Sequence, residues 1–223
     1  MTDQRADVEW RDGVVPVSVQ FDDPYYSLDD GVAETQHVFL CGNDLPTRFC
    51  DGFHVAELGF GTGLNFLVTL AAWRAANVTG KLHFTSFEAF PMQVAEMRYA
   101  LKAFPDLPID VFSTDTNEGV LAPTLHGPDF ELTVIFGDAR NTLANWNCQA
   151  NAWYLDGFSP AKNPELWEEA LLEQVAAHTL SGGTVATYTS AGFVRRGLAT
   201  AGFTVSRVQG FGRKRHMTRG TLA

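Results

Sequence analysis

The feature that most constrains the fold is an alternation of short apolar runs with longer segments of helical periodicity, which begins near residue 54. Apolar runs of strand length occur at residues 54–58, 81–87, 132–136, 152–155 and 183–189. Apolar residues recur at helical spacing over residues 64–76, 92–104 and 164–178. This repetition of strand, loop and helix predicts an α/β fold with a doubly wound, mainly parallel sheet of the Rossmann-like kind. The ligand crevice of such a sheet lies at the carboxyl ends of its strands, so functional side chains are expected there.

The two ends of the chain depart from this alternation. Residues 1–53 carry turn signals and several aromatic side chains, and we interpret them as a small β-rich cap over the crevice. Residues 54–223 would form the core, whose last part is expected to hold antiparallel strands over 203–208 and 216–222 joined by a basic turn. One globular unit is expected overall.

Composition narrows the class of protein. With 45% hydrophobic residues and no run of about 18 apolar residues, the chain is expected to be cytoplasmic and to have no membrane partner. Its first twelve residues are too charged for a secretory signal. Because the three cysteines are an odd number with no CxxC spacing, no metal site is expected.

Charge is unevenly distributed along the chain. Residues 1–173 hold nine Lys/Arg and all 26 Asp/Glu, whereas residues 174–223 hold seven Lys/Arg and no acid. The net charge of −10 therefore divides into −17 and +7, and the basic end can bind phosphates locally. The alternative is that these basic residues are merely solvated side chains near helix ends.

The segment Glu57-Leu-Gly-Phe-Gly-Thr-Gly63 lies between the first predicted strand and helix. There, glycines and the free N–H groups of the helix start let the backbone approach a nucleotide. A dinucleotide site would more usually place its third glycine one residue later. The carboxylate of Glu57 suits the ammonium of a methionine moiety better than a pyrophosphate, which it would repel. The pattern favours S-adenosylmethionine over a dinucleotide.

Two further acids end the next predicted strands. Glu88 can accept hydrogen bonds from both ribose hydroxyls, and Asp138 can accept one from an adenine amino group. Each of these acids alone also fits an N-cap or turn residue. Their coincidence with the glycine loop favours the cofactor interpretation.

The fourth predicted strand ends in Asp156-Gly-Phe-Ser-Pro-Ala-Lys-Asn-Pro164, whose glycine and prolines indicate a rigid loop. Asp156 could orient an amine and accept its proton. Phe158 could stack on a flipped base, and Lys162 could meet a phosphate. The alternative is a tight structural loop with Lys162 solvated.

These segments resemble the methyltransferase part of the bifunctional tRNA 5-methylaminomethyl-2-thiouridine biosynthesis proteins, the MnmC family. The resemblance extends almost end to end. It rests on Phe21–Ser27, Glu34–Leu40, Glu57–Phe66, Phe84–Pro91, Leu155–Pro164, Thr189–Gly197 and Gly210–Arg215.

The resemblance implies a class I S-adenosylmethionine-dependent methyltransferase that methylates the 5-aminomethyl group of the wobble (2-thio)uridine in tRNA. Asp156 would then sit at the amine as the catalytic residue, and S-adenosylhomocysteine would be the product. The cofactor-binding residues would be Glu57, Gly59, Phe60, Gly61, Gly63, Asn65, Glu88, Asp138, Ala139, Asp156 and Phe158. The residues facing the tRNA anticodon arm would be Tyr25, Phe158, Lys162, Arg195, Arg196, Arg213, Lys214 and Arg215.

The family's fused form continues into a flavin-dependent oxidase, as a domain or partner that supplies the aminomethyl substrate. This chain is expected to methylate but not to oxidise, and to bind neither FAD nor metal. Three alternatives stay open: a small amine or a protein as the acceptor, a non-catalytic nucleotide- or RNA-binding protein, and a dinucleotide oxidoreductase. The acid-free C-terminal stretch argues against the first, and the acids at the strand ends argue against the second.

Overall fold

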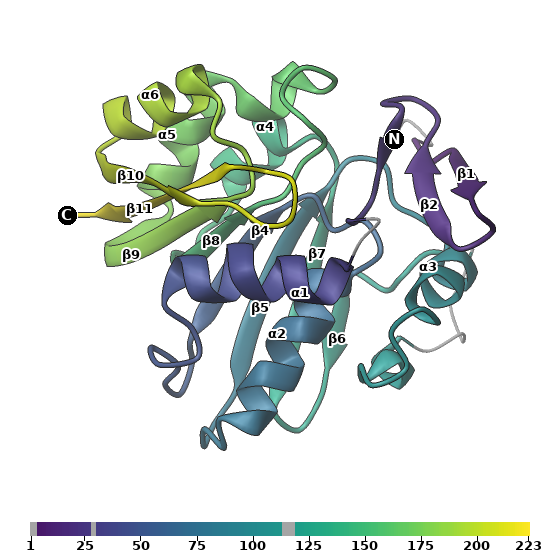
Figure 1. The fold of residues 1–223 in the computed structure, drawn as a ribbon. Helices are drawn as coiled ribbons and strands as arrows, with labels where there is room; N and C mark the ends of the chain where they lie inside the picture. Colours follow the sequence, from purple (N-terminus) through teal and green to yellow (C-terminus); the bar gives the residue numbers. More distant parts are fainter. Residues whose placement is uncertain (1–3, 28–29, 113–118) are drawn as a thin grey trace.

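The predicted doubly wound, mainly parallel sheet is confirmed. The computed structural model describes residues 4–27, 30–112 and 119–223. In this described part, a central eight-stranded sheet has the order β10-β11-β9-β8-β4-β5-β7-β6 (Figure 1). Its strands are β4 His54–Leu58, β5 Leu82–Glu88, β6 Thr124–His126, β7 Phe130–Phe136, β8 Ala150–Leu155, β9 Thr179–Thr187, β10 Phe203–Gln209 and β11 His216–Leu222. The run β9-β8-β4-β5-β7 is parallel, whereas β6, β10 and β11 are antiparallel to their neighbours.

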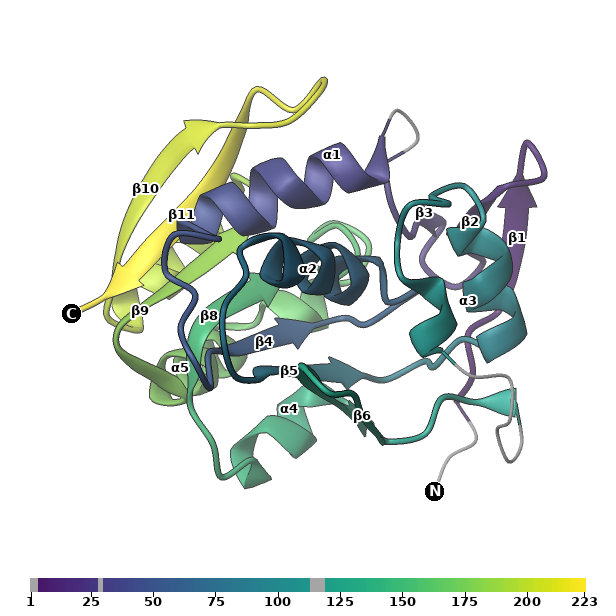
Figure 2. The ribbon, with the colours of Figure 1, turned by 90° about the horizontal axis from the view of Figure 1, so that it is seen from below.

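Helices cover both faces of the sheet. Figures 1 and 2 show α1 and α2 on one face, and α4 and α5 on the other, with α6 packed beside α5. The helices are α1 Gly31–Thr35, α2 Leu64–Ala75, α3 Val94–Leu101, α4 Ala139–Thr142, α5 Glu169–Ala177 and α6 Gly192–Thr200. Successive side chains of a strand point to opposite faces. The adjacent residues Trp153 and Tyr154 of β8 are therefore both fully buried but belong to different hydrophobic clusters.

The N-terminal segment contains the expected small antiparallel sheet, followed by a helical stretch that the sequence did not predict. Strands β1 Val8–Arg11, β2 Val15–Ser18 and β3 Asp23–Pro24 form a small antiparallel sheet. The chain then turns helical through α1, a π-helical turn Gln36–Leu40 (η1) and a 3-10 turn Cys41–Asn43 (η2). Asp30 begins this helical stretch, since its side chain accepts a hydrogen bond from the Ala33 N–H at 2.9 Å. A boundary between residues 53 and 54 stays a prediction.

The predicted helix over 164–178 is divided in two. Residues Pro164–Trp167 (η6) form a 3-10 turn, and α5 starts only at Glu169, because Glu168 between them has an extended backbone with ψ 144°. The buried Trp167 side chain holds this break in place by donating its Nε1–H to the Phe158 carbonyl at 2.9 Å.

Three further elements differ from the sequence expectations. Strand β6 and helix α6 were not predicted, and α3 is shorter than the predicted 92–104. Within the described ranges, no helix combines the length and apolarity required to span a bilayer.

Candidate active site

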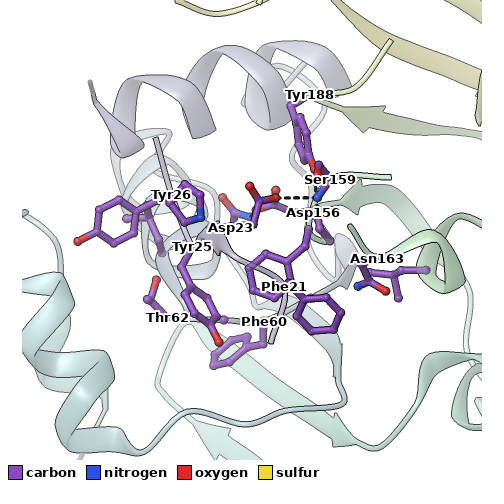
Figure 3. A pocket seen from close by; sticks show the side chains of 18 of the residues that line it. Phe21, Asp23, Tyr25, Tyr26, Phe60, Thr62, Asp156, Ser159, Asn163 and Tyr188 are labelled. Atoms are coloured by element: carbon purple, nitrogen blue, oxygen red, sulfur yellow. Dashed lines mark hydrogen bonds between the residues drawn. The ribbon is translucent and has the colours of Figure 1, made fainter. Parts of the chain in front are cut away.

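A cavity of about 620 Å³ opens at the carboxyl ends of the parallel strands. Figure 3 shows side chains from both halves of the chain meeting there: Phe21 and Tyr25 from the N-terminal segment, and Asp156 and Tyr188 after β8 and β9. The Asp23 carboxylate ties the two halves together by accepting a hydrogen bond from the Ser159 N–H at 2.8 Å. The cavity therefore lies where the sequence places the crevice.

The glycine loop (residues 59–63) requires glycine for two reasons. Gly59, Gly61 and Gly63 have positive φ angles of 92°, 54° and 78°, which other residues adopt at a cost. A Cβ at Gly59 would also lie 2.7 Å from the backbone oxygen of Asp156. The loop can thus pack directly on the start of the 156–164 loop and leave its N–H groups near the cavity.

Glu88 connects the end of β5 to the glycine loop. Its Oε2 accepts the Gly61 N–H at 2.9 Å and its Oε1 accepts the Phe90 N–H at 2.7 Å. The side chain is buried, and burial raises the pKa of its carboxyl against the effect of these hydrogen bonds. Glu88 lines the cavity, and the backbone N–H groups of Phe60 and Ala89 also act on its carboxylate and lower its pKa.

The Asn65 amide, at the start of α2, bridges two carboxylates. Its Nδ2 donates to Asp156 Oδ2 at 2.6 Å and to Glu57 Oε1 at 2.8 Å. The other Glu57 oxygen accepts the Ser86 hydroxyl at 2.7 Å. Thr35 of α1 donates its hydroxyl to Asn65 Oδ1 at 2.7 Å, which settles which way the amide faces.

Glu57 lies beneath the cavity and does not line it. Its side chain is fully buried with both oxygens hydrogen-bonded, and burial raises the pKa of its carboxyl well above the ordinary value. The expected direct contact between Glu57 and a ligand ammonium is therefore not present in this geometry. Its influence on the cavity passes through Asn65, which does line it. Gly63 also lies outside the lining.

Asp156 lies at the cavity wall directly after β8. Burial raises the pKa of its carboxyl to about 7, against the opposing effect of the Asn65 hydrogen bond. The charge of Glu34 raises this pKa further, and that of Lys214 lowers it. A carboxyl with such a pKa can exchange a proton near neutral pH.

Asp138 and Ala139 line the cavity at the start of α4. Asp138 caps this helix by accepting the Arg140 N–H at 2.9 Å, and its Oδ2 pairs with the Arg140 guanidinium at 2.6 Å. That guanidinium holds the pKa of the Asp138 carboxyl below its ordinary value. Asp138 is therefore the N-cap of α4, as the alternative interpretation predicted, and it also lines the cavity.

Aromatic rings cover the cavity from the side of the N-terminal segment. Phe158 stacks on Phe21 with ring centroids 4.8 Å apart and meets Tyr25 edge-on at 5.1 Å. Phe21 in turn contacts Phe90 at 5.6 Å. Tyr25, Phe60 and Phe158 thus line the cavity, while their contacts with cofactor and tRNA stay a prediction. The sequence analysis did not assign Phe21 and Phe90 to the site, although both belong to segments that carry the family resemblance.

The two lysines among the predicted tRNA-facing residues form ion pairs, and the arginines differ in whether they line the cavity. Lys162 does not line the cavity and pairs with Asp22 Oδ2 at 3.0 Å, while Lys214 lines it and pairs with Glu34 Oε1 at 2.8 Å. Arg213 lines the cavity mouth, and Arg195, Arg196 and Arg215 lie outside the lining. Both lysines form ion pairs with acids of the N-terminal segment, and their contact with tRNA phosphates stays a prediction.

The charges of three arginines act on His216 at the start of β11. Burial and the charges of Arg207, Arg215 and Arg195 lower the pKa of the His216 imidazole. Arg207, in β10, was not singled out from the sequence. We call Arg195, Arg207 and Arg215 the arginine cluster.

The strand order and the acids at the strand ends define a Rossmann-like enzyme of the nucleotide-cofactor class. The family model described as "S-adenosyl-L-methionine-dependent methyltransferase" matches residues 112–223. The chain belongs to this family of S-adenosyl-L-methionine-dependent methyltransferases, which confirms the class predicted from the sequence.

Individual proteins similar to this chain indicate a particular group of methyltransferases. The "tRNA 5-methylaminomethyl-2-thiouridine biosynthesis bifunctional protein MnmC" of Aeromonas hydrophila is 44% identical over 98% of this chain, and that of Marinobacter nauticus is 43% identical over 97%. The chain spans only 35% and 36% of the lengths of these relatives. The crystal structure of MNMC2 from Aquifex aeolicus superposes with a TM-score of 0.74 at 25% identity, covering 99% of this chain and 72% of that one. The resemblance stated from the sequence is thereby confirmed.

Proposed function

We propose that this protein transfers a methyl group from S-adenosylmethionine to the 5-aminomethyl nitrogen of the wobble (2-thio)uridine in tRNA. The observation that carries the proposal is the position of Asp156: a cavity-wall carboxyl with a pKa of about 7, beside the glycine loop and under aromatic rings. A carboxylate there suits an amine acceptor that must lose a proton. The tRNA substrate is proposed from the names of the relatives, whose similarity extends over nearly the whole chain.

The residues present fit S-adenosylmethionine. Positive-φ glycines allow close backbone approach, and Glu88, which lines the cavity after β5, would accept hydrogen bonds from ribose hydroxyls. Asp138 and Ala139 would border the adenine, and Phe60, Gly61, Asn65 and Phe158 would complete the contacts. The cofactor supplies an electrophilic methyl group on a sulfonium sulfur. Glu57 would support this site indirectly, by holding Asn65.

Asp156 would act on the acceptor nitrogen. An alkylamine is mostly protonated at neutral pH and then has no lone pair for methyl transfer. In its ionised form, Asp156 can orient the amine and accept the proton that nitrogen loses. Asn65 holds the carboxylate for this task with a hydrogen bond of 2.6 Å. The rings of Phe21, Tyr25 and Phe158 would exclude water and stack on the base.

The tRNA would approach over the C-terminal surface. Arg213 lines the cavity, and Arg195, Arg196 and Arg215 belong to the same acid-free stretch of sequence. These four arginines would bind phosphates of the anticodon arm. Because base chemistry needs an exposed base, the wobble uridine is expected to be flipped out of its stack. A structure of the tRNA complex in which the wobble uridine is still stacked would refute this base flipping. The substrate would come from a cytoplasmic reaction, catalysed by a flavin oxidase domain or separate protein, that exposes the aminomethyl group.

The test is transfer of labelled methyl from S-adenosylmethionine to tRNA from cells that lack this modification step, followed by nucleoside analysis. Labelled 5-methylaminomethyl-(2-thio)uridine is the expected product. Asp156→Ala is expected to abolish turnover while cofactor binding persists. Cofactor binding without labelled tRNA would move the acceptor to a small amine or a protein. Tight binding of NADH in place of S-adenosylmethionine would overturn the cofactor assignment.

A further inference from the structure

The ammonium group of Lys214 lies in a contact made from three distant parts of the chain. Its Nζ is 2.8 Å from Glu34 Oε1 and 4.0 Å from the ring centroid of Tyr188. Lys214 belongs to the turn between β10 and β11, Glu34 to α1, and Tyr188 to the chain after β9. All three residues line the same cavity as Asp156.

The Tyr188 ring is held in place and Glu34 is largely buried, whereas the lysine is partly exposed to solvent. The Glu34 side chain is 15% exposed, and the Tyr188 hydroxyl donates to the Gly157 carbonyl at 2.8 Å, which fixes the ring beside the 156–164 loop. The Lys214 side chain is 46% exposed and lies on a turn. Glu34 and the Tyr188 ring therefore form a site whose present occupant, the ammonium group of Lys214, can be exchanged for another group.

The surroundings favour a cation. Burial raises the pKa of the Tyr188 hydroxyl, and the charges of Asp156, Asp23 and Glu34 raise it further, so three carboxylates act on one ring. A carboxylate beside an aromatic face is the usual chemistry of ammonium recognition, because the face of the ring carries partial negative charge. A phosphate would be repelled from this wall. The ligand class that matches it is an alkylammonium.

We propose that Glu34 and the ring of Tyr188 form an ammonium subsite, which the side chain of Lys214 fills in the free protein and the acceptor's own ammonium group takes over. The identity of that acceptor rests on the function proposed above. The subsite selects a cationic aminomethyl group over an uncharged alkyl group before Asp156 receives the proton. Displacement of Lys214 returns its charge to the cavity mouth.

The test observes Lys214 directly in the full chain. Protons near its Nζ lie over the Tyr188 ring, whose ring current displaces their NMR signals. Lysine labelled with ¹³C at Cε is recorded during titration with propylammonium, and Lys214→Met assigns the peak by removing it. Propylammonium is expected to move the Lys214 peak to the position of a solvated lysine, while the matched neutral probe 1-propanol leaves it in place. No movement with propylammonium would overturn the subsite.

Variants separate the subsite from general charge effects. Glu34→Gln is expected to weaken propylammonium binding about tenfold, and Lys214→Met to strengthen it by a similar factor. Lys102 offers a matched control, since its ammonium lies 5.3 Å from the ring centroid of Tyr99 outside the cavity lining. Lys102→Met is expected to leave the affinity unchanged. Equal effects of the two lysine variants would overturn the proposal.

The same titration with 5-aminomethyluridine, against 5-methyluridine as the neutral control, tests the link to the proposed function. Displacement of Lys214 by 5-aminomethyluridine supports both the ammonium subsite and the proposed function. Displacement by propylammonium but not by 5-aminomethyluridine leaves the subsite standing and refutes the aminomethyluridine acceptor.

Discussion

Asn65 and Asp156 are joined by a hydrogen bond of 2.6 Å from the amide nitrogen to the carboxylate, and the same amide nitrogen also donates to Glu57 at 2.8 Å. This geometry requires the Asn65 oxygen to face away from both acids. Thr35 provides the reason, since its hydroxyl donates to that oxygen at 2.7 Å. A residue of the N-terminal helical stretch thus orients the group that holds the proposed catalytic carboxylate.

The pH dependence of methyl transfer should report this relationship. Because Asp156 must be ionised to accept a proton and its pKa is about 7, single-turnover rates are expected to rise with pH up to about pH 7. Thr35→Val removes the hydroxyl at similar volume and frees the amide to turn, which weakens the donor to Asp156. The acid limb of the profile is then expected to move to higher pH, with a loss of about 1–3 kcal/mol of stability for the buried hydrogen bond. Thr35→Ser should restore both the pH profile and the stability. If the acid limb of the profile does not move in Thr35→Val, Thr35 does not position Asn65.

Asp156→Asn should stabilise the fold at alkaline pH. The pKa of Asp156 is raised from 3.8 to about 7, so the folded protein binds this proton more tightly than the unfolded chain does. Ionisation between about pH 4 and pH 7 therefore lowers the free energy of unfolding, by at most about 4 kcal/mol. The variant avoids this cost, and its gain in Tm over the parent should be about 5 °C larger at pH 8 than at pH 5. Equal gains at both pH values would show that Asp156 is not protonated in the fold.

Gly59→Ala should damage the cofactor site through backbone contact. Its Cβ would meet the Asp156 oxygen at 2.7 Å, and its φ of 92° is already unfavourable for alanine, so a destabilisation of about 3 kcal/mol is expected. Affinity for S-adenosylhomocysteine should fall at least about tenfold, because the loop must shift. Gly52→Ala is the control: it also has positive φ but nothing within 4 Å of the added atom. Calorimetry on both should show loss of ligand affinity in Gly59→Ala alone.

Neutralising the arginine cluster should weaken tRNA binding in a salt-dependent way. Arg195→Ala and Arg215→Ala are each expected to reduce the slope of log affinity against log salt by about 1, because each would remove one phosphate contact. Arg74→Ala is the control, since Arg74 pairs with Asp129 at 2.6 Å in the last turn of α2. Filter-binding titrations at several salt concentrations would check this, and an unchanged slope in the first two variants would place the RNA elsewhere.

Much of the core could be predicted from local patterns. Strand β4 was expected over 54–58 and observed as His54–Leu58, and α2 ends one residue before its predicted end, because apolar periodicity directly reflects which face is buried. The helical stretch from Gly31 to Asn43 was missed, since its π-helical and 3-10 turns break the α-helical period. The divided helix at Glu168 was missed as well, because the long-range contact of Trp167 with Phe158 decides it.

The sequence by itself determined the five parallel strands, the helix α2, the glycine loop and the acids at the ends of β4, β5, β7 and β8, because these depend on residue type and spacing along a short stretch. Only the tertiary structure decided what each acid does. Glu57 is buried beneath Asn65 while Asp156 lines the cavity, although both follow the same local pattern. It also decided that Lys214 meets Glu34 and Tyr188, side chains 180 and 26 residues away along the chain. Burial and pairing set the pKa and accessibility of a charged group, and both arise from contacts between segments that are far apart in the sequence.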